Sequence, residues 1–110
     1  MNLYVDDRRS PPEGWALARS VTAAIRLIAS FVPDEVSLDH DICHSVGKTK
    51  VACNETFAGV AVFIASIPHE MRPKKVIIHT SNPVGAQTML AILKGKVESV
   101  KIVPAEKEAK

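Results

Sequence analysis

The sequence lacks the features that mark secreted, membrane-bound and repeat proteins. It has only two cysteines, Cys43 and Cys53, which are too few and too irregularly placed to form a disulfide framework. No stretch reaches the roughly 18 consecutive apolar residues of a membrane span. The N-terminus has no positively charged segment followed by an apolar run, so no signal peptide is indicated. We therefore expect a cytoplasmic protein that makes no contact with a membrane.

The chain also lacks an internal repeat, and nothing in its composition separates a second domain. Its 110 residues fit one domain with a single core. Hydrophobic residues make up 46% and charged residues 24%, which are the proportions of a folded soluble protein and exclude a disordered chain. We expect one domain over residues 1–104 and a charged tail at residues 105–110.

Strand-like and helix-like segments alternate along the sequence. Runs of apolar and β-branched residues predict five strands. These strands are residues 2–5, 15–19, 35–39, 74–79 and 97–103. Apolar residues at helical spacing predict three helices, each preceded by a residue that caps a helix N-terminus. The caps are Ser20, Asn54 and Asn82.

Two connections are expected to be irregular. Residues 7–14 contain Pro11, Pro12 and Gly14, which exclude regular secondary structure. Residues 42–53 are the second connection, and we expect a long loop there. The alternation elsewhere predicts an α/β fold with a mostly parallel five-stranded sheet, in the order 2-1-3-4-5, covered by helices on both faces.

Ionisable side chains follow three of the predicted strands at the point where each strand ends. Asp6 and Asp7 follow the first strand, residues 39–41 (Asp-His-Asp) end the third, and His79 ends the fourth. The C-terminal ends of parallel strands lie at one edge of a sheet, and ligands bind there where the strand order reverses. In the order 2-1-3-4-5 these three strands are neighbours. We therefore expect the ionisable groups to converge on one cleft.

The same residues resemble the pattern of a known family. A parallel five-stranded domain with Asp-Asp after its first strand and Asp after its third is similar to the receiver domain of two-component signalling. The finer resemblance is to the cyclic-phosphate-processing receiver family, whose pattern is Asp-Asp-x-Arg, Gly-Trp, Leu-Asp-His-Asp and His-Ser-x-Asn-Pro-x-Gly. The matching residues are Asp6, Asp7, Arg9, Pro12, Gly14, Trp15, Leu38, Asp39, His40, Asp41, His79, Asn82, Pro83 and Gly85.

This resemblance covers nearly the whole chain and implies both a fold and a function. The implied fold is a receiver-like, flavodoxin-like domain of three layers, in which the proline-rich loop replaces the first crossover helix. The implied function is the processing of cyclic phosphates in RNA repair or RNA-end metabolism. The expected partner is thus a phosphate-containing small molecule or an RNA end, and the sequence does not define the oligomeric state.

A divalent metal ion is expected at the acidic groups. Crowded carboxylates repel one another unless a cation lies among them, and Mg²⁺ prefers carboxylate oxygens. The resemblance to receiver domains likewise implies Mg²⁺, and Mn²⁺ is the alternative. The expected metal ligands are Asp6, Asp7, Asp39 and Asp41. The competing interpretation is that Asp6 and Asp7 only cap a turn or face solvent.

Two histidines add proton-transfer chemistry that an ordinary receiver domain does not have. Opening a 2′,3′-cyclic phosphate needs a base to activate water and an acid to protonate the leaving oxygen, and histidine can serve as either at neutral pH. We therefore expect His40, His79 and Asp39 to be catalytic. For His79, a purely structural role as a buried, hydrogen-bonded side chain is equally consistent with the sequence.

Phosphate binding is expected at the start of the third helix and in the first loop. A helix N-terminus presents free backbone N–H groups to an anion, and an arginine can bind a phosphate with two hydrogen bonds. The expected substrate-binding residues are Arg9, Thr80, Ser81 and Asn82. The competing interpretations are a solvated arginine and an asparagine that only caps the helix.

The sequence also departs from the family pattern and from ordinary receivers. Arg8 stands where the family tends to have an acid, and Thr80 where it has serine. Val103 precedes Pro104, so the lysine of ordinary receivers is missing from this position, which argues against phosphoacceptor signalling. We expect a metal-assisted phosphoesterase that processes cyclic phosphates. The alternative is a non-catalytic phosphate- or nucleotide-binding module, or a signalling receiver phosphorylated on Asp39.

Overall fold

The five-stranded sheet confirms the predicted strand order. A computed structural model describes the backbone of residues 1–46 and 50–104 and the side chains of residues 1–42 and 55–103. Five strands form one sheet in the order β2-β1-β3-β6-β7, and every neighbouring pair is parallel. The strands are β1 (Asn2–Val5), β2 (Ala16–Ala18), β3 (Glu35–Leu38), β6 (Lys75–Thr80) and β7 (Ser99–Pro104).

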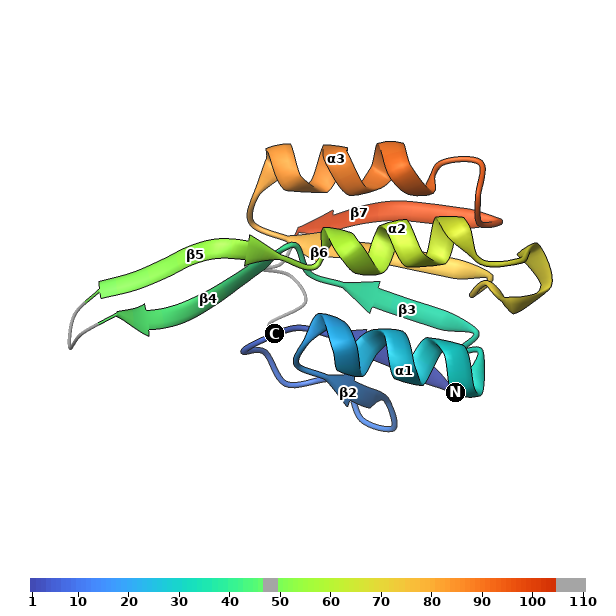
Figure 1. The fold of residues 1–110 in the computed structure, drawn as a ribbon, viewed down its shortest axis with the longest axis horizontal. Coiled ribbons are helices and arrows are strands. Elements are labelled where there is room, and N and C mark those ends of the chain that lie inside the picture. The colour runs from blue at the N-terminus through green and yellow to red at the C-terminus, as the bar shows by residue number, and fades with distance from the viewer. Residues whose placement is uncertain (47–49, 105–110) are drawn as a thin grey trace.

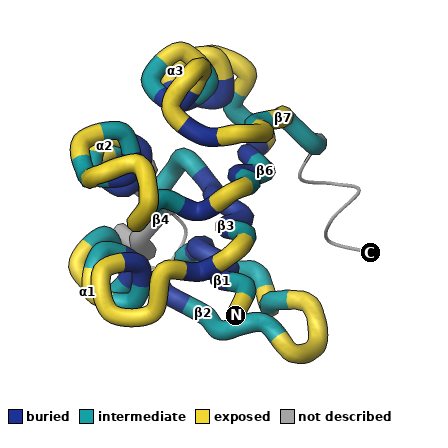
Figure 2. Tube along the Cα trace, turned by 90° about the vertical axis from the view of Figure 1, so that its right-hand side faces the viewer, coloured by how far each residue is buried: buried dark blue, intermediate teal, exposed yellow. Residues whose placement is uncertain are grey.

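Three helices lie on one face of this sheet (Figure 2), and α2 packs between the other two. They are α1 (Val21–Phe31), α2 (Ala58–Ser66) and α3 (Pro83–Leu93). The connections that contain these helices all advance in the same direction across the sheet, and right-handed crossovers then place every helix on the same face. The predicted caps Ser20 and Asn82 are confirmed, because their side chains accept the backbone N–H of Ala23 and Gly85.

The expected third layer is wrong for the described part of the chain. Only the step from β1 to β2 runs in the opposite direction, so only its connection could place a helix on the other face. That connection, residues 6–15, contains turns and bends. The described residues therefore form two layers. The predicted tail at residues 105–110 lies outside the described residues.

The hydrophobic core fills the space between the sheet and the helices. β1, β3 and β6 each contribute two buried residues to it, spaced two apart in the strand, and β2 contributes Ala18. The six residues from β1, β3 and β6 are Leu3, Val5, Val36, Leu38, Val76 and Ile78. Because successive strand residues point to opposite faces, Tyr4, Ser37 and His79 lie on the face without helices. The same alternation carries Asp6 and Asp39, which follow β1 and β3, to that face at the C-terminal edge of the sheet.

A β-hairpin stands where the sequence predicted a long loop. Strands β4 (Asp41–Val46) and β5 (Lys50–Thr56) pair antiparallel and project away from the main sheet (Figure 1). The expectation of a loop over residues 42–53 is therefore wrong for the described backbone, because isoleucine and valine here favour strands. The predicted cap Asn54 is also wrong. It belongs to β5, and the residue that precedes α2 is the buried Phe57.

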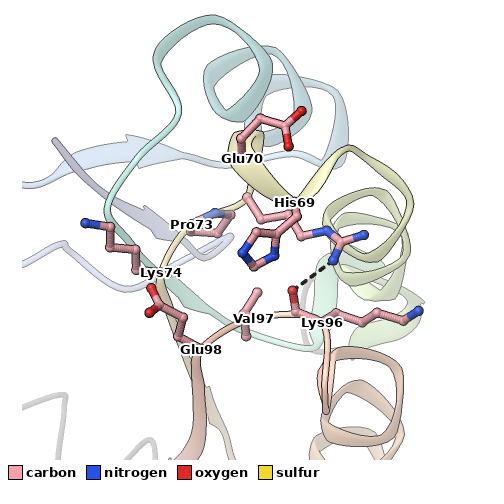
Figure 3. A pocket seen from close by; sticks show the side chains of 8 residues that line it. His69, Glu70, Pro73, Lys74, Lys96, Val97 and Glu98 are labelled. Carbon is pink, nitrogen blue, oxygen red and sulfur yellow. Dashed lines mark hydrogen bonds between the residues drawn. The ribbon is translucent and has the colours of Figure 1, made fainter.

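A small pocket lies at the N-terminal edge of the sheet, where β6 and β7 begin, beside the short helix η1 (His69–Met71). The pocket has a volume of about 140 Å³, and Figure 3 shows its charged and apolar lining. Arg72, one of the lining residues, donates hydrogen bonds to the backbone oxygens of Ala65, Ile67 and Lys96. This guanidinium thereby satisfies carbonyl groups at the C-terminal end of α2.

None of the helices in the described residues is long and apolar enough to cross a membrane.

Candidate functional site

Three ionisable side chains meet at the C-terminal edge of the sheet. Asp6 follows β1, Asp39 follows β3, and His79 lies near the end of β6, and these strands are neighbours. One ligand atom from each residue lies within 4.8 Å of the other two. All three side chains are buried. The predicted convergence of groups from three strand ends is thus found for these three residues.

Asp6 is held by donors on both carboxylate oxygens. Oδ1 accepts the backbone N–H groups of Arg8 and Arg9 at 2.8 and 2.9 Å. Oδ2 accepts the Nη1 group of Arg9 at 3.0 Å and lies 2.9 Å from Nε2 of His79. Burial by itself would raise the pKa of Asp6, but the hydrogen bonds from His79, from the two backbone groups and from Arg9 hold it well below its usual value. Asp6 is therefore a carboxylate across the physiological pH range.

Asp39 has the opposite electrostatic environment. Its Oδ1 accepts the backbone N–H of His40 at 2.8 Å, and its Oδ2 lies 3.6 Å from Nη1 of Arg9. Burial and the negative charge of Asp6 raise the pKa of Asp39 to about 6, and the contacts with His40, His79 and Arg9 only partly oppose this. One carboxylate of the pair is thus strongly stabilised in its charged form, and the other is not.

Arg9 bridges the two carboxylates through a single nitrogen. Its guanidinium is partly buried, which lowers the pKa, but the hydrogen bond and charge of Asp6 and the charge of Asp39 raise it on balance. The loop that carries Arg9 is fixed by Arg19, whose Nη1 donates to the backbone oxygens of Arg9 at 3.0 Å and of Asp6 at 3.5 Å. A cation of this chain therefore offsets part of the charge of the acidic pair.

His79 is enclosed by other side chains. Its ring is fully buried and stacks on Tyr4, with 4.5 Å between the ring centroids and 8° between the planes. Nε2 contacts Asp6, and Nδ1 lies 2.7 Å from Oγ of Ser37. Both ring nitrogens thus contact buried protein groups, so the ring supports Asp6 and does not face a substrate. The polar Ser37 within an apolar strand was the sequence signal for this contact.

His40 and Asp41 form a second group beside the first. Nδ1 of His40 lies 2.7 Å from Oδ1 of Asp41, and the same oxygen accepts Nδ2 of Asn82 at 3.2 Å. A Cβ atom at Gly85 would overlap the His40 ring, so the glycine leaves room for this ring against the first turn of α3. The carboxylate of Asp41, predicted as a metal ligand, therefore contacts a histidine and an asparagine.

The remaining predicted site residues lie around these groups. Asp7 is partly buried and, among the described residues, lies outside the cluster of Asp6, Asp39 and His79. Thr80 is buried, and its Oγ1 accepts the backbone N–H of Asn82 at 3.1 Å. Ser81 is exposed at the same edge.

The donor set of the buried cluster fits a divalent metal ion. Two carboxylates and an imidazole nitrogen are ligands for Mg²⁺ or Mn²⁺, and the carboxylates favour the harder ion. Asp6 and Asp39 are the residues that would hold it. His79 would then either ligate the ion or orient Asp6 through the hydrogen bond between them.

Comparisons with known proteins agree with the observed fold. The response regulator domain of Thermotoga maritima CheB has a similar crystal structure, with a TM-score of 0.52, 18% identity, and coverage of 90% of this chain and 74% of that chain. At this identity the likeness concerns the receiver fold alone. No curated protein sequence matches the chain. The family model for the cyclic-phosphate processing receiver domain matches residues 1–95. The chain therefore belongs to the cyclic-phosphate processing receiver domain family.

Proposed function

We propose that this domain is a metal-assisted phosphoesterase that opens cyclic phosphates, with the cyclic-phosphate end of an RNA as a candidate substrate. The observation that carries the proposal is the pairing of His40 with Asp41 at 2.7 Å, directly after Asp39, which forms a buried acidic pair with Asp6. This edge thus combines a proton-transfer group with carboxylates that suit a divalent ion. Membership of the family supports the substrate class.

The contact with Asp41 assigns the two nitrogens of His40 different roles. An ionised carboxylate only accepts hydrogen bonds, so Nδ1 carries the proton that faces Asp41. In the neutral ring, Nε2 is then the basic nitrogen. Asn82 holds the same carboxylate oxygen, and Gly85 lets the ring pack against α3. Asp41 and Asn82 therefore position His40 and need not contact a substrate themselves.

The ring-opening reaction needs one proton removed and one supplied. A water oxygen bonds to phosphorus, and the bond from phosphorus to the 2′ or 3′ oxygen breaks. His40 Nε2 takes the proton of the water and can return it to the leaving oxygen, which gives a phosphomonoester and a free hydroxyl. A divalent ion bound by Asp6 and Asp39 would supply polarisation of a phosphoryl oxygen.

A second candidate is a non-catalytic phosphate- or nucleotide-binding module, or a signalling receiver with Asp39 as phosphoacceptor. The burial of His79 favours it, because this burial removes one of the two histidines expected to transfer protons. Against ordinary signalling, Val103, which lies opposite His79 in the pairing of β6 with β7, occupies the position of the missing lysine.

Hydrolysis assays separate the two candidates. We would measure turnover of 2′,3′-cyclic mononucleotides and of a cyclic-phosphate-ended RNA with Mg²⁺, with Mn²⁺ and with chelator. The variant His40→Gln is expected to lose about 10²–10⁴-fold in turnover, the typical contribution of a general acid–base group. The matched control is His69→Gln, because His69 is an exposed histidine at the opposite edge and its replacement should leave turnover unchanged.

The outcome that contradicts catalysis is the absence of turnover on every substrate by the unaltered chain, or full activity in His40→Gln. Phosphate binding without turnover would favour the binding module. Labelling by a small phosphodonor that is lost in Asp39→Asn would favour the signalling receiver.

A further inference from the structure

We propose that Arg9 is a displaceable counter-ion of the acidic pair. Without a divalent ion its guanidinium pairs with Asp6 and Asp39, and a divalent ion that binds these carboxylates releases the guanidinium to bind a phosphate group. Metal occupancy and phosphate binding are thereby coupled through one side chain. The phosphate part rests on the proposed function, whereas the competition between Arg9 and the metal ion does not.

The competition follows from shared oxygen atoms. Nη1 of Arg9 lies 3.0 Å from Oδ2 of Asp6 and 3.6 Å from Oδ2 of Asp39. Both carboxylates belong to the donor group that fits a divalent ion. Mg²⁺ approaches its oxygen ligands to about 2.0–2.1 Å and demands near-octahedral surroundings. A guanidinium nitrogen placed between the two carboxylates occupies that volume, so the ion and Arg9 exclude each other.

The side chain of Arg9 can leave without unfolding its loop. The backbone of residue 9 is held on both sides of its Cα atom. Its N–H donates to Asp6 at 2.9 Å, and its carbonyl oxygen accepts a hydrogen bond from Arg19 at 3.0 Å. The side chain itself is 21% exposed, against 0% for Asp6 and 7% for Asp39. The guanidinium thus lies on the solvent side of the carboxylates, and release moves only the side chain.

The released guanidinium suits a phosphate both in geometry and in charge. Its planar set of N–H donors binds two phosphate oxygens at once. With both carboxylates ionised, the three side chains of Asp6, Asp39 and Arg9 carry a net charge of −1. A divalent ion changes this to +1. The same event that frees Arg9 therefore converts a group that repels anions into one that attracts them.

Chemical modification tests the release in the unaltered protein. We would treat the chain with phenylglyoxal, which reacts with accessible guanidinium groups, in chelator and in saturating Mg²⁺, and follow each arginine by mass spectrometry. Arg9 is expected to react several-fold faster with Mg²⁺. Arg8 is exposed and adjacent in sequence, so its rate serves as the internal control and should not change. An Arg9 rate that is unchanged or slower in Mg²⁺ would overturn the proposal.

Calorimetry tests the competition independently. We would titrate Mg²⁺ into Arg9→Gln and into Arg8→Gln, which removes the same charge one residue away. Arg9→Gln is expected to bind Mg²⁺ about tenfold more tightly than Arg8→Gln, which corresponds to ~1.4 kcal/mol. Equal or weaker binding by Arg9→Gln would refute the competition. Inorganic phosphate should bind more tightly with Mg²⁺ than with chelator in Arg8→Gln, and this gain should be smaller in Arg9→Gln, where only the charge of the ion remains; a gain of equal size in both variants would refute the coupling.

Neither measurement depends on turnover. If the hydrolysis assay fails while Arg9→Gln binds Mg²⁺ more tightly than its control, the proposed phosphoesterase is wrong and the counter-ion role of Arg9 stands. If turnover is metal-dependent but the two variants bind Mg²⁺ equally, the counter-ion role is wrong and the phosphoesterase stands.

Discussion

Replacing Asp39 by asparagine should stabilise the metal-free protein at neutral pH. The pKa of Asp39 is raised from 3.8 to about 6 by burial and by the charge of Asp6, so its ionised form is unfavourable in the folded state. An asparagine has nearly the same shape, carries no charge, and retains an oxygen that can accept the backbone N–H of His40. The change therefore removes the unfavourable charge and retains this hydrogen bond.

The size and the pH range of this effect follow from the raised pKa. The folded chain holds the Asp39 proton more tightly than the unfolded chain. Protonated Asp39 therefore stabilises the fold; this stabilisation is complete below pH 3.8 and is lost as the pH rises through about 6. A difference of about two pKa units corresponds to about 3 kcal/mol. Because 1 kcal/mol shifts the melting temperature of a domain of this size by roughly 4 °C, the variant should melt of the order of 10 °C higher at pH 7.5 in chelator.

The assay is thermal or urea denaturation of both proteins at several pH values between 4 and 7.5 in chelator. The gap in stability should widen as the pH rises and should shrink when Mg²⁺ is added, because the ion stabilises only the unaltered chain. The control is Asp34→Asn, because the side chain of Asp34 is 73% exposed and forms an ion pair with the N-terminal amine at 3.4 Å. If Asp39→Asn is less stable than the unaltered chain at pH 7.5 in chelator, the reasoning about the acidic pair is refuted.

Two further predictions concern the positioning of His40. Gly85→Ala places a methyl group where the His40 ring lies, so turnover should fall at least tenfold while circular dichroism shows an intact fold; unchanged turnover would contradict the assigned role of the ring. Asn82→Ala removes the cap of α3 and the contact with Asp41, and urea denaturation should show a loss of about 1 kcal/mol, typical of a lost N-cap. A stability equal to that of the unaltered chain would contradict the capping role.

The strand order and the place of the site could be predicted because both depend on short-range patterns. Each of β1, β3 and β6 is an apolar run that ends in ionisable residues, and the C-terminal ends of parallel strands share one edge. The acidic pair of Asp6 and Asp39 could therefore be placed from the sequence. The family resemblance agreed with it residue by residue, and the family match covers residues 1–95.

The contacts of individual side chains could not be predicted in the same way. His79 was expected either to transfer protons or to be a buried, hydrogen-bonded side chain, and its contacts depend on Ser37 and Tyr4, which reach it only through the pairing of separate strands. Asp41 was predicted as a metal ligand, and it lies two residues from Asp39. In a strand-like segment that spacing keeps a side chain on the same face but does not decide which neighbour it contacts. The hairpin of β4 and β5 was missed because its strands pair only with each other.

The third layer was expected because helices that alternate with strands usually cover both faces of a parallel sheet. A helix on the second face requires a connection that runs from β1 to β2 with helical residues in it, and residues 6–15 contain two adjacent prolines. The same loop instead supplies Arg9 to the acidic pair. The proline-rich segment thus carries part of the candidate site.

The position of the acidic pair within the sheet has a consequence for local opening of the fold. The three central strands carry the site: Asp6 follows β1, Asp39 follows β3, and His79 lies in β6. Strands β2 and β7 form the two sides of the sheet. Fraying of native proteins begins at edges and costs far less than global unfolding. An edge strand can therefore separate transiently while the three central strands, and with them the carboxylates, keep their register. Conversely, the pair is assembled only when β1 and β3, which are distant in sequence, have joined, so the repulsion between its charges does not arise before that step of folding.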